Sequence, residues 1–128
     1  MQVPLFDDWS ANSSPKRGAD SIWSHVRVAG ARDAVEPPIN HPTRVIAREY
    51  LVERLTALAD QRVLIGFDMP YGYPAGFAAA CGLRAEAPWL AIWQHLADRL
   101  IDLPDNANNR FEIASALNAS ISDGPGPF

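Results

Sequence analysis

The sequence has a single cysteine, Cys81, among its 128 residues. One thiol excludes an intramolecular disulfide and a zinc site built on thiolates. No apolar run approaches the ~18 residues of a membrane span. The amino-terminal residues Met-Gln-Val-Pro-Leu-Phe-Asp-Asp lack the basic region of a targeting peptide. We therefore expect a cytoplasmic protein that does not associate with membranes.

Positive charge is also scarce. The chain has 11 Lys and Arg residues against 15 Asp and Glu residues, so its net charge is −4. Non-specific binding to nucleic acid needs a basic surface to neutralise phosphates, and this balance argues against it while leaving room for a small local basic patch. The length and the 48% hydrophobic content predict one domain that spans residues 1–128.

Hydrophobic periodicity predicts an alternation of strands and helices. The expected strands cover 3–9, 20–30, a weaker segment within 31–39, and 63–69; the expected helices cover 42–60, 76–81, 88–101 and 109–119. Apolar residues at helical spacing within 45–58 and 89–100 predict that these faces lie in the core. The right-handed crossover rule places the strand at 63–69 parallel to the first strand and beside it. This order predicts an α/β fold, a ribonuclease H-like mixed sheet with helices.

The stretch Val-Leu-Ile-Gly-Phe-Asp-Met-Pro at 63–70 organises this layout. Its apolar run predicts a strand that is buried on both faces. Asp68 stands at the carboxyl end of the run, and a loop rich in proline and glycine follows. Open α/β sheets bind their ligands at this end of their strands. A functional carboxylate is one interpretation, and an aspartate that caps the turn into the next helix is the other.

Asp8 ends the first strand, so the predicted pairing brings it close to Asp68. Two adjacent carboxylates repel unless a cation or a proton lies between them. Mg²⁺ and Mn²⁺ prefer oxygen ligands, and such ions stabilise the oxygens that change charge in phosphodiester cleavage. Glu49 or Glu53 on the helix at 42–60 is a candidate third ligand, although helical glutamates are usually solvated. Asp7 faces the opposite side of its strand.

A second polar cluster precedes the last predicted helix, within Asp102 to Glu112. Capping of the helix explains it simply. The functional alternative is that Arg110, with Glu112 beside it, contributes to an anion site at the start of the helix.

Four segments carry a resemblance to a known family: Asp8–Ala11, Asp20–Trp23, Gly66–Pro74 and Asn108–Glu112. They resemble the DUF429 group of uncharacterised bacterial proteins, which are predicted ribonuclease H-like nucleases. The resemblance implies acidic site residues at the ends of the first and fourth strands, here Asp8 and Asp68. Some members of that group carry labels from cobalamin or molybdopterin cofactor biosynthesis.

The resemblance also implies a fifth strand and a late helix with another acidic ligand, and the tail at 122–128 shows no such strand. We therefore expect a shortened, C-terminally truncated member, or a partner chain that supplies the missing part. A homodimer that covers the open side of the sheet is one such arrangement.

These observations predict a divalent-metal-dependent phosphodiester hydrolase that acts on nucleic acid or on a phosphorylated small molecule. The alternatives are a catalytically inactive binding or assembly module and an accessory protein of cofactor biosynthesis. In the hydrolase, Asp8 and Asp68 are the expected ligands of Mg or Mn. The expected catalytic residues are Asp8, Asp68 and Glu49. Substrate binding is assigned to Ser10, Tyr71, Arg110 and Glu112.

Overall fold

A computed structural model of the chain describes residues 2–10, 12–27, 36–69, 72–84 and 86–121. The chain forms two compact units: the first comprises 1–69 and 104–107, the second 70–103 and 108–128. That both belong to one domain stays a prediction. Tyr71 and much of the segment expected to hold the weak third strand lie outside the described residues.

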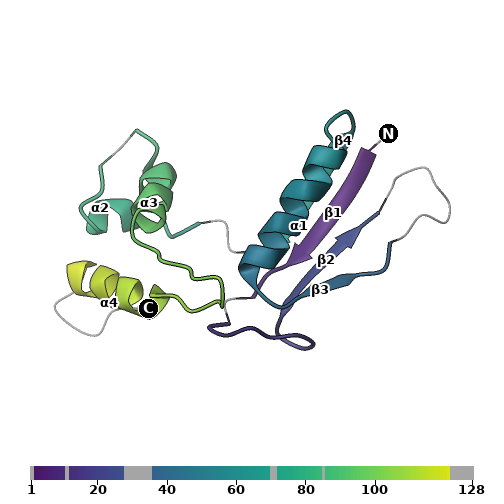
Figure 1. Cartoon of the computed structure of the whole chain (residues 1–128). Coiled ribbons are helices and arrows are strands. Elements are labelled where there is room, and N and C mark those ends of the chain that lie inside the picture. The colour runs from purple at the N-terminus through teal and green to yellow at the C-terminus, as the bar shows by residue number, and fades with distance from the viewer. Residues whose placement is uncertain (1, 11, 28–35, 70–71, 85, 122–128) are drawn as a thin grey trace. The chain divides into compact units, whose positions relative to one another are not determined.

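The first unit is built on a four-stranded sheet (Figure 1). Its strands are β1 (Gln2–Asp8), β2 (Ile22–Val26), β3 (Ile39–His41) and β4 (Arg62–Asp68), in the order β3-β2-β1-β4. β1 pairs antiparallel with β2 and parallel with β4, and α1 (Arg44–Ala57) makes the crossover between β3 and β4. This confirms the predicted α/β fold, and the mixed sheet with helices is consistent with a ribonuclease H-like layout.

One face of the sheet packs on α1. Leu5, Val26 and Leu51 form the buried centre of this core, and Ile65 and Phe67 of β4 pack against it. These side chains occupy alternate strand positions, as expected for a face that meets a helix.

The start and the rotation of α1 differ from the prediction. The helix begins after Thr43, whose side chain accepts a hydrogen bond from the backbone N–H of Ile46, so Pro42 lies just outside it. Ala47 and Leu51 are buried, whereas Ile46 is 44% exposed. The face of α1 that meets the sheet therefore contains Ala47 and Leu51, and the adjacent Ile46 lies on the solvent side.

One prediction about the strands is wrong in detail. β4 is not buried on both faces: it lies at an edge of the sheet, and Leu64 is 53% exposed. A continuous apolar run occurs in strands with one covered face as well as in strands with two. The hydrophobic pattern of the sequence therefore does not tell which of these two kinds of strand β4 is. β3 comes at 39–41, at the end of the segment expected to hold the weak third strand and directly after Pro37 and Pro38, which lack the N–H donors that a strand ladder uses.

The second unit is helical. It contains α2 (Phe77–Ala80), α3 (Pro88–Ala97) and α4 (Arg110–Ile121), which pack around Phe77, Ala78, Ile92 and Leu117. The half-buried Cys81 packs against this core, as expected of a small apolar residue. None of the helices in the described residues is long and apolar enough to cross a membrane.

Only part of the apolar face predicted for α3 lies in the core, where Ile92 is buried and Leu96 packs against it. Trp89 is 63% exposed and Trp93 is 48% exposed, and within the helix only Ile92 is buried. Apolar residues surround α3 on more sides than its short helical neighbours cover.

The two sides of α1 give a matched test of the core. Leu51→Ala removes buried methyl groups against Leu5 and Val26, so we expect it to lower the free energy of unfolding by about 2 to 5 kcal/mol. Ile46→Ala lies on the exposed side and should cost far less. Urea unfolding of both variants measures the difference, and equal losses would contradict this placement of the core.

Candidate functional site

The parallel pairing of β1 with β4 places Asp8 directly opposite Asp68. Neighbouring strands lie ~4.8 Å apart, and paired residues of a parallel ladder project to the same face. Both aspartates are exposed at the carboxyl ends of their strands. The structure therefore brings together the two carboxylates that the crossover rule placed side by side.

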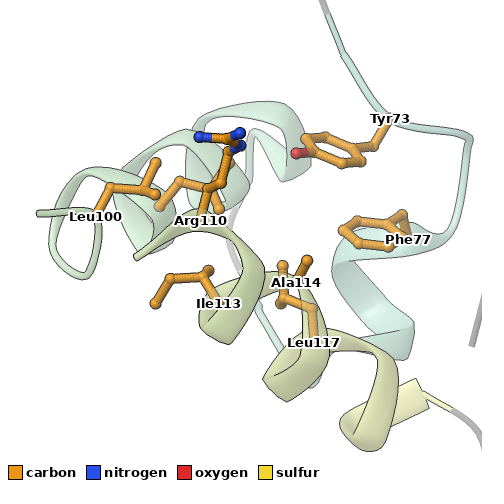
Figure 2. A pocket seen from close by; sticks show the side chains of 8 residues that line it. Tyr73, Phe77, Leu100, Arg110, Ile113, Ala114 and Leu117 are labelled. Carbon is orange, nitrogen blue, oxygen red and sulfur yellow. The ribbon is translucent and has the colours of Figure 1, made fainter. Parts of the chain in front are cut away.

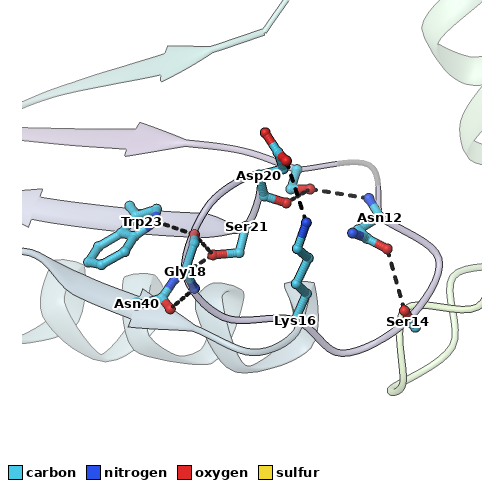
Figure 3. A network of polar contacts seen from close by, with 9 residues as sticks. Asn12, Ser14, Lys16, Gly18, Asp20, Ser21, Trp23 and Asn40 are labelled. Carbon is cyan, nitrogen blue, oxygen red and sulfur yellow. Dashed lines mark hydrogen bonds and ion pairs between the residues drawn. The ribbon is translucent and has the colours of Figure 1, made fainter.

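A network of polar contacts fixes the loop that follows Asp8 (Figure 3). The Ser10 hydroxyl donates to the carbonyl of Asp20 at 3.0 Å and accepts from the backbone N–H of Asn12 at 3.2 Å. Ser10 thus closes a turn, and its predicted contact with substrate stays a prediction.

The same loop is attached to β3 through Gly18. Its N–H donates to the Asn40 side chain at 2.8 Å, and its carbonyl accepts from Ser21 and from the Trp23 indole. Gly18 has a φ of 84°, a left-handed conformation that glycine adopts without strain. The loop is therefore held at both of its ends.

Arg44 is a buried anchor that sequence reasoning missed. It is only 9% exposed, and its guanidinium donates to the carbonyls of Ser10, Asn12 and Asn106 at 3.2, 2.8 and 2.7 Å. Asn106 in turn accepts from the backbone N–H of Arg44 at 2.8 Å. These contacts join the loop after β1, the start of α1 and the segment 104–107. Arginines at helix starts are common on surfaces, so the sequence carries no signal of this burial.

Asp7 begins a buried polar chain on the opposite face of β1 from Asp8. Asp7, Ser24 and His41 are 2%, 1% and 3% exposed. Ser24 Oγ donates to Asp7 Oδ1 at 2.5 Å and lies 2.9 Å from His41 Nε2. The His41 ring contacts Tyr50 of α1. Among the described residues, Asp7 Oδ2 has no hydrogen-bond partner.

Burial shifts the pKa values at both ends of this chain. It raises the pKa of Asp7, against the opposing effect of the Ser24 hydrogen bond. Burial and the charge of Arg17 lower the pKa of His41. Here serine lies between the acid and the imidazole, whereas a nucleophilic triad needs the imidazole in the middle. The chain therefore does not activate Ser24 as a nucleophile of that type.

The third predicted ligand does not join the pair. Glu49 is exposed on α1, which covers the Asp7 face of the sheet rather than the Asp8 face. Within the part of the chain that the structure describes, no three His, Cys, Asp or Glu side chains lie close enough together to hold a metal ion. The structure thus provides two carboxylates and does not bring Glu49 to them.

Arg110 and Glu112 belong to the second unit, in the first turn of α4. The Asn108 side chain accepts from both the backbone N–H and the guanidinium of Arg110, at 3.3 and 2.9 Å. Asn109 bonds to the backbone of Arg99 and Ile101. These side chains therefore stabilise the turn before the helix, and both capping of α4 and anion binding by Arg110 stay predictions. Glu112 is exposed.

Comparison of the chain with protein-family models, with curated proteins and with solved structures finds no match. The resemblance to the DUF429 group stays a prediction.

The raised pKa of Asp7 makes stability depend on pH. Between the ordinary value of 3.8 and the raised value, the folded chain binds more protons than the unfolded chain. The contribution of Asp7 to the free energy of unfolding therefore falls as pH rises through that window. Asp7→Asn does not titrate and should lack this fall. Urea unfolding from about pH 4 to about pH 7 gives the free energy of unfolding of the wild type and of Asp7→Asn. The difference between the two should decrease as pH rises.

His41 provides a control of opposite sign. Its pKa is lowered from 6.5, so its contribution to stability is complete above 6.5 and is lost as pH falls towards the lowered value. His41→Gln should remove that rise with pH. If the free energy of unfolding of either variant differed from that of the wild type by an amount that does not change with pH, this would contradict the assigned direction of the pKa shift of that residue.

Proposed function

We propose that the protein is a divalent-cation-dependent phosphodiester hydrolase whose Mg²⁺ or Mn²⁺ ion is held by Asp8 and Asp68. The observation that supports this proposal is the register of β1 and β4, which pairs the two aspartates at the carboxyl ends of parallel strands. Ligands of open α/β sheets bind beyond these ends.

The donors suit a hard cation. Mg²⁺ is commonly held by one or two carboxylates, with water and substrate phosphate completing its shell. Asp8 and Asp68 are both exposed, so water and a phosphate can reach the same ion. A bound cation relieves the repulsion between the two carboxylates. It also supplies charge stabilisation for phosphate oxygens and lowers the pKa of a bound water.

The residues around Asp8 hold it in position and are not assigned a chemical step. Ser10 closes the turn after β1, and Arg44 binds the carbonyls of Ser10 and Asn12. On the other face of the strand, Leu5 is fully buried in the core. These contacts limit the movement of the strand end, so less conformational entropy is lost when two ligands converge on one ion.

A binding or assembly module that does not catalyse is the second candidate. It is favoured by the absence of a third ligand in the described segments, since two carboxylates leave the rest of the coordination shell of the ion to water and substrate. The third candidate, an accessory role in cofactor biosynthesis, rests only on the predicted family resemblance.

Calorimetric titration with Mn²⁺ distinguishes these candidates. We expect the wild type to bind one equivalent, and Asp8→Asn and Asp68→Asn to weaken binding at least about tenfold, because each removes a charged ligand. Asp60→Asn is the matched control, since Asp60 is exposed in the turn before β4, at the other end of that strand. Its Mn²⁺ affinity should equal that of the wild type.

Cleavage is measured in parallel on short labelled DNA and RNA and on bis(p-nitrophenyl) phosphate. Cleavage that requires Mn²⁺ and disappears in Asp68→Asn is the expected result. Binding that depends on Asp68 without any cleavage would favour the binding module. Equal Mn²⁺ affinity in the wild type and in Asp68→Asn would overturn the metal site itself.

A further inference from the structure

The carboxylate pair belongs to a row of four residues that crosses the sheet. Asp68 pairs with Asp8, and Asp8 pairs in turn with Trp23 of β2. Trp23 pairs with Asn40 of β3. Side chains of directly paired residues project to the same face of a sheet. Trp23 therefore lies on the face of Asp8 and Asp68, which α1 does not cover, and it stands one strand, or ~4.8 Å, from Asp8.

The indole of Trp23 is accessible on this face. Ile22 and Ser24, its neighbours along β2, are 2% and 1% exposed, whereas Trp23 itself is only half-buried. Leu64 of β4 projects to the same face as Asp68, and it is 53% exposed. A ligand that approaches the two aspartates can therefore reach part of the indole ring.

The loop before β2 holds the ring of Trp23 in place. The indole N–H donates to the carbonyl of Gly18 at 3.1 Å (Figure 3). The N–H of Gly18 donates to the Asn40 side chain at 2.8 Å, and the Asn40 side chain donates to the Ser21 hydroxyl at 2.7 Å. Because these contacts already fix the ring, little conformational entropy is lost when a ligand packs on it.

A phosphodiester that carries a base matches this row of residues. When an ion at Asp8 and Asp68 binds its phosphate, the sugar and the base are the next groups of the substrate, and β2 is the next strand of the sheet. Bases stack with their flat faces on aromatic side chains. A base inside a duplex is already stacked on its neighbours, so it must leave the stack before it can contact a side chain in this way.

The overall charge of the chain also favours a substrate with few phosphate contacts. The chain has 11 Lys and Arg residues against 15 Asp and Glu residues. Binding along the backbone of a duplex needs many basic contacts with phosphates. Recognition through one ion and one stacked base does not need a basic surface.

We propose that Trp23 binds an unpaired base of a single-stranded nucleic acid or dinucleotide whose phosphodiester lies at Asp8 and Asp68. This inference rests on the proposed function, because the ion positions the phosphate beside Trp23. It narrows the substrate from phosphodiesters in general to those that carry an unpaired base. Trp23 binds the substrate and takes no part in the chemical step.

The test compares the dinucleotide thymidylyl-thymidine with an analogue that has the same sugars and phosphate but no bases. Both are titrated into the ¹⁵N-labelled full chain with Mg²⁺ present, and two-dimensional NMR follows binding. Phosphorus NMR of the same samples confirms that the dinucleotides are intact. The wild type should bind thymidylyl-thymidine at least about fivefold more tightly than the analogue. The indole N–H signal of Trp23 should shift with the base-bearing dinucleotide and much less with the analogue.

Two variants separate the aromatic ring from its hydrogen bond. Trp23→Phe and Trp23→Leu both lose the indole N–H that donates to Gly18, and only Trp23→Phe keeps a flat ring. Trp23→Phe should retain most of the preference for the base-bearing dinucleotide. Trp23→Leu should bind the two dinucleotides equally. The spectrum of each variant reports whether it is folded.

A cavity in the second unit provides the control for base binding elsewhere. It has a volume of about 180 Å³ and is lined by the stacked rings of Tyr73 and Phe77, and by Arg110 of α4 (Figure 2). Ala114→Leu fills this cavity and should leave the preference for the base-bearing dinucleotide unchanged. Loss of the preference in a folded Ala114→Leu variant would place base binding in the cavity and would overturn the assignment to Trp23.

Further outcomes separate this inference from the proposed function. Equal affinity of the wild type for the two dinucleotides, or an unchanged preference in a folded Trp23→Leu variant, would overturn the assignment of Trp23 and leave the metal site intact. Asp68→Asn should weaken binding of both dinucleotides by a similar factor and keep the preference for the base. If Asp68→Asn bound both as the wild type does while Trp23→Leu lost the preference, the metal site would fail and base binding by Trp23 would stand.

Discussion

The parallel pairing of β1 with β4 is the constraint on which the first unit depends. It sets Leu5 against Ile65 in the core and, three residues further along, Asp8 against Asp68 at the strand ends. A slip of one residue would turn every side chain of β4 to the opposite face and would remove Ile65 from the core. The same register that buries the apolar residues therefore fixes which carboxylates meet, so the stability of the sheet and the geometry of the candidate site have one cause.

The two faces of β1 separate two kinds of acidic residue. Asp7 enters the core, where Ser24 donates to it and burial favours its neutral form, whereas Asp8 reaches solvent beside Asp68. A buried carboxylate with one oxygen that lacks a partner among the described residues costs stability. The chain Asp7–Ser24–His41 links three neighbouring strands, so a shift of any strand would break its hydrogen bonds. This favours a role for the chain in holding the register, at a cost in stability that depends on pH.

Much of this arrangement could be predicted from the sequence. The apolar run before Asp68, the helix before it and the handedness of crossovers were enough to place β4 beside β1 and Asp8 near Asp68. The exposure of Leu64 and Trp89 could not be predicted, because hydrophobic periodicity does not report whether a partner covers a face. Nor could the burial of Arg44, whose contacts with Asn106 join residues 62 positions apart. The cavity beside Arg110 likewise depends on how three helices pack, which no local pattern encodes.

If Asp8 and Asp68 act as one site, one Mg²⁺ ion binds both carboxylates, and ¹³C NMR of their carboxyl carbons during a Mg²⁺ titration tests this. Mg²⁺ is diamagnetic, so each carboxylate that it binds can be followed individually. We expect the two carboxyl signals to shift together with a single Kd, while the signal of Asp60 at the opposite end of β4 stays unchanged. Shifts of similar size in all exposed carboxylates, or separate affinities for Asp8 and Asp68, would show that the paired strand ends do not form a cation site.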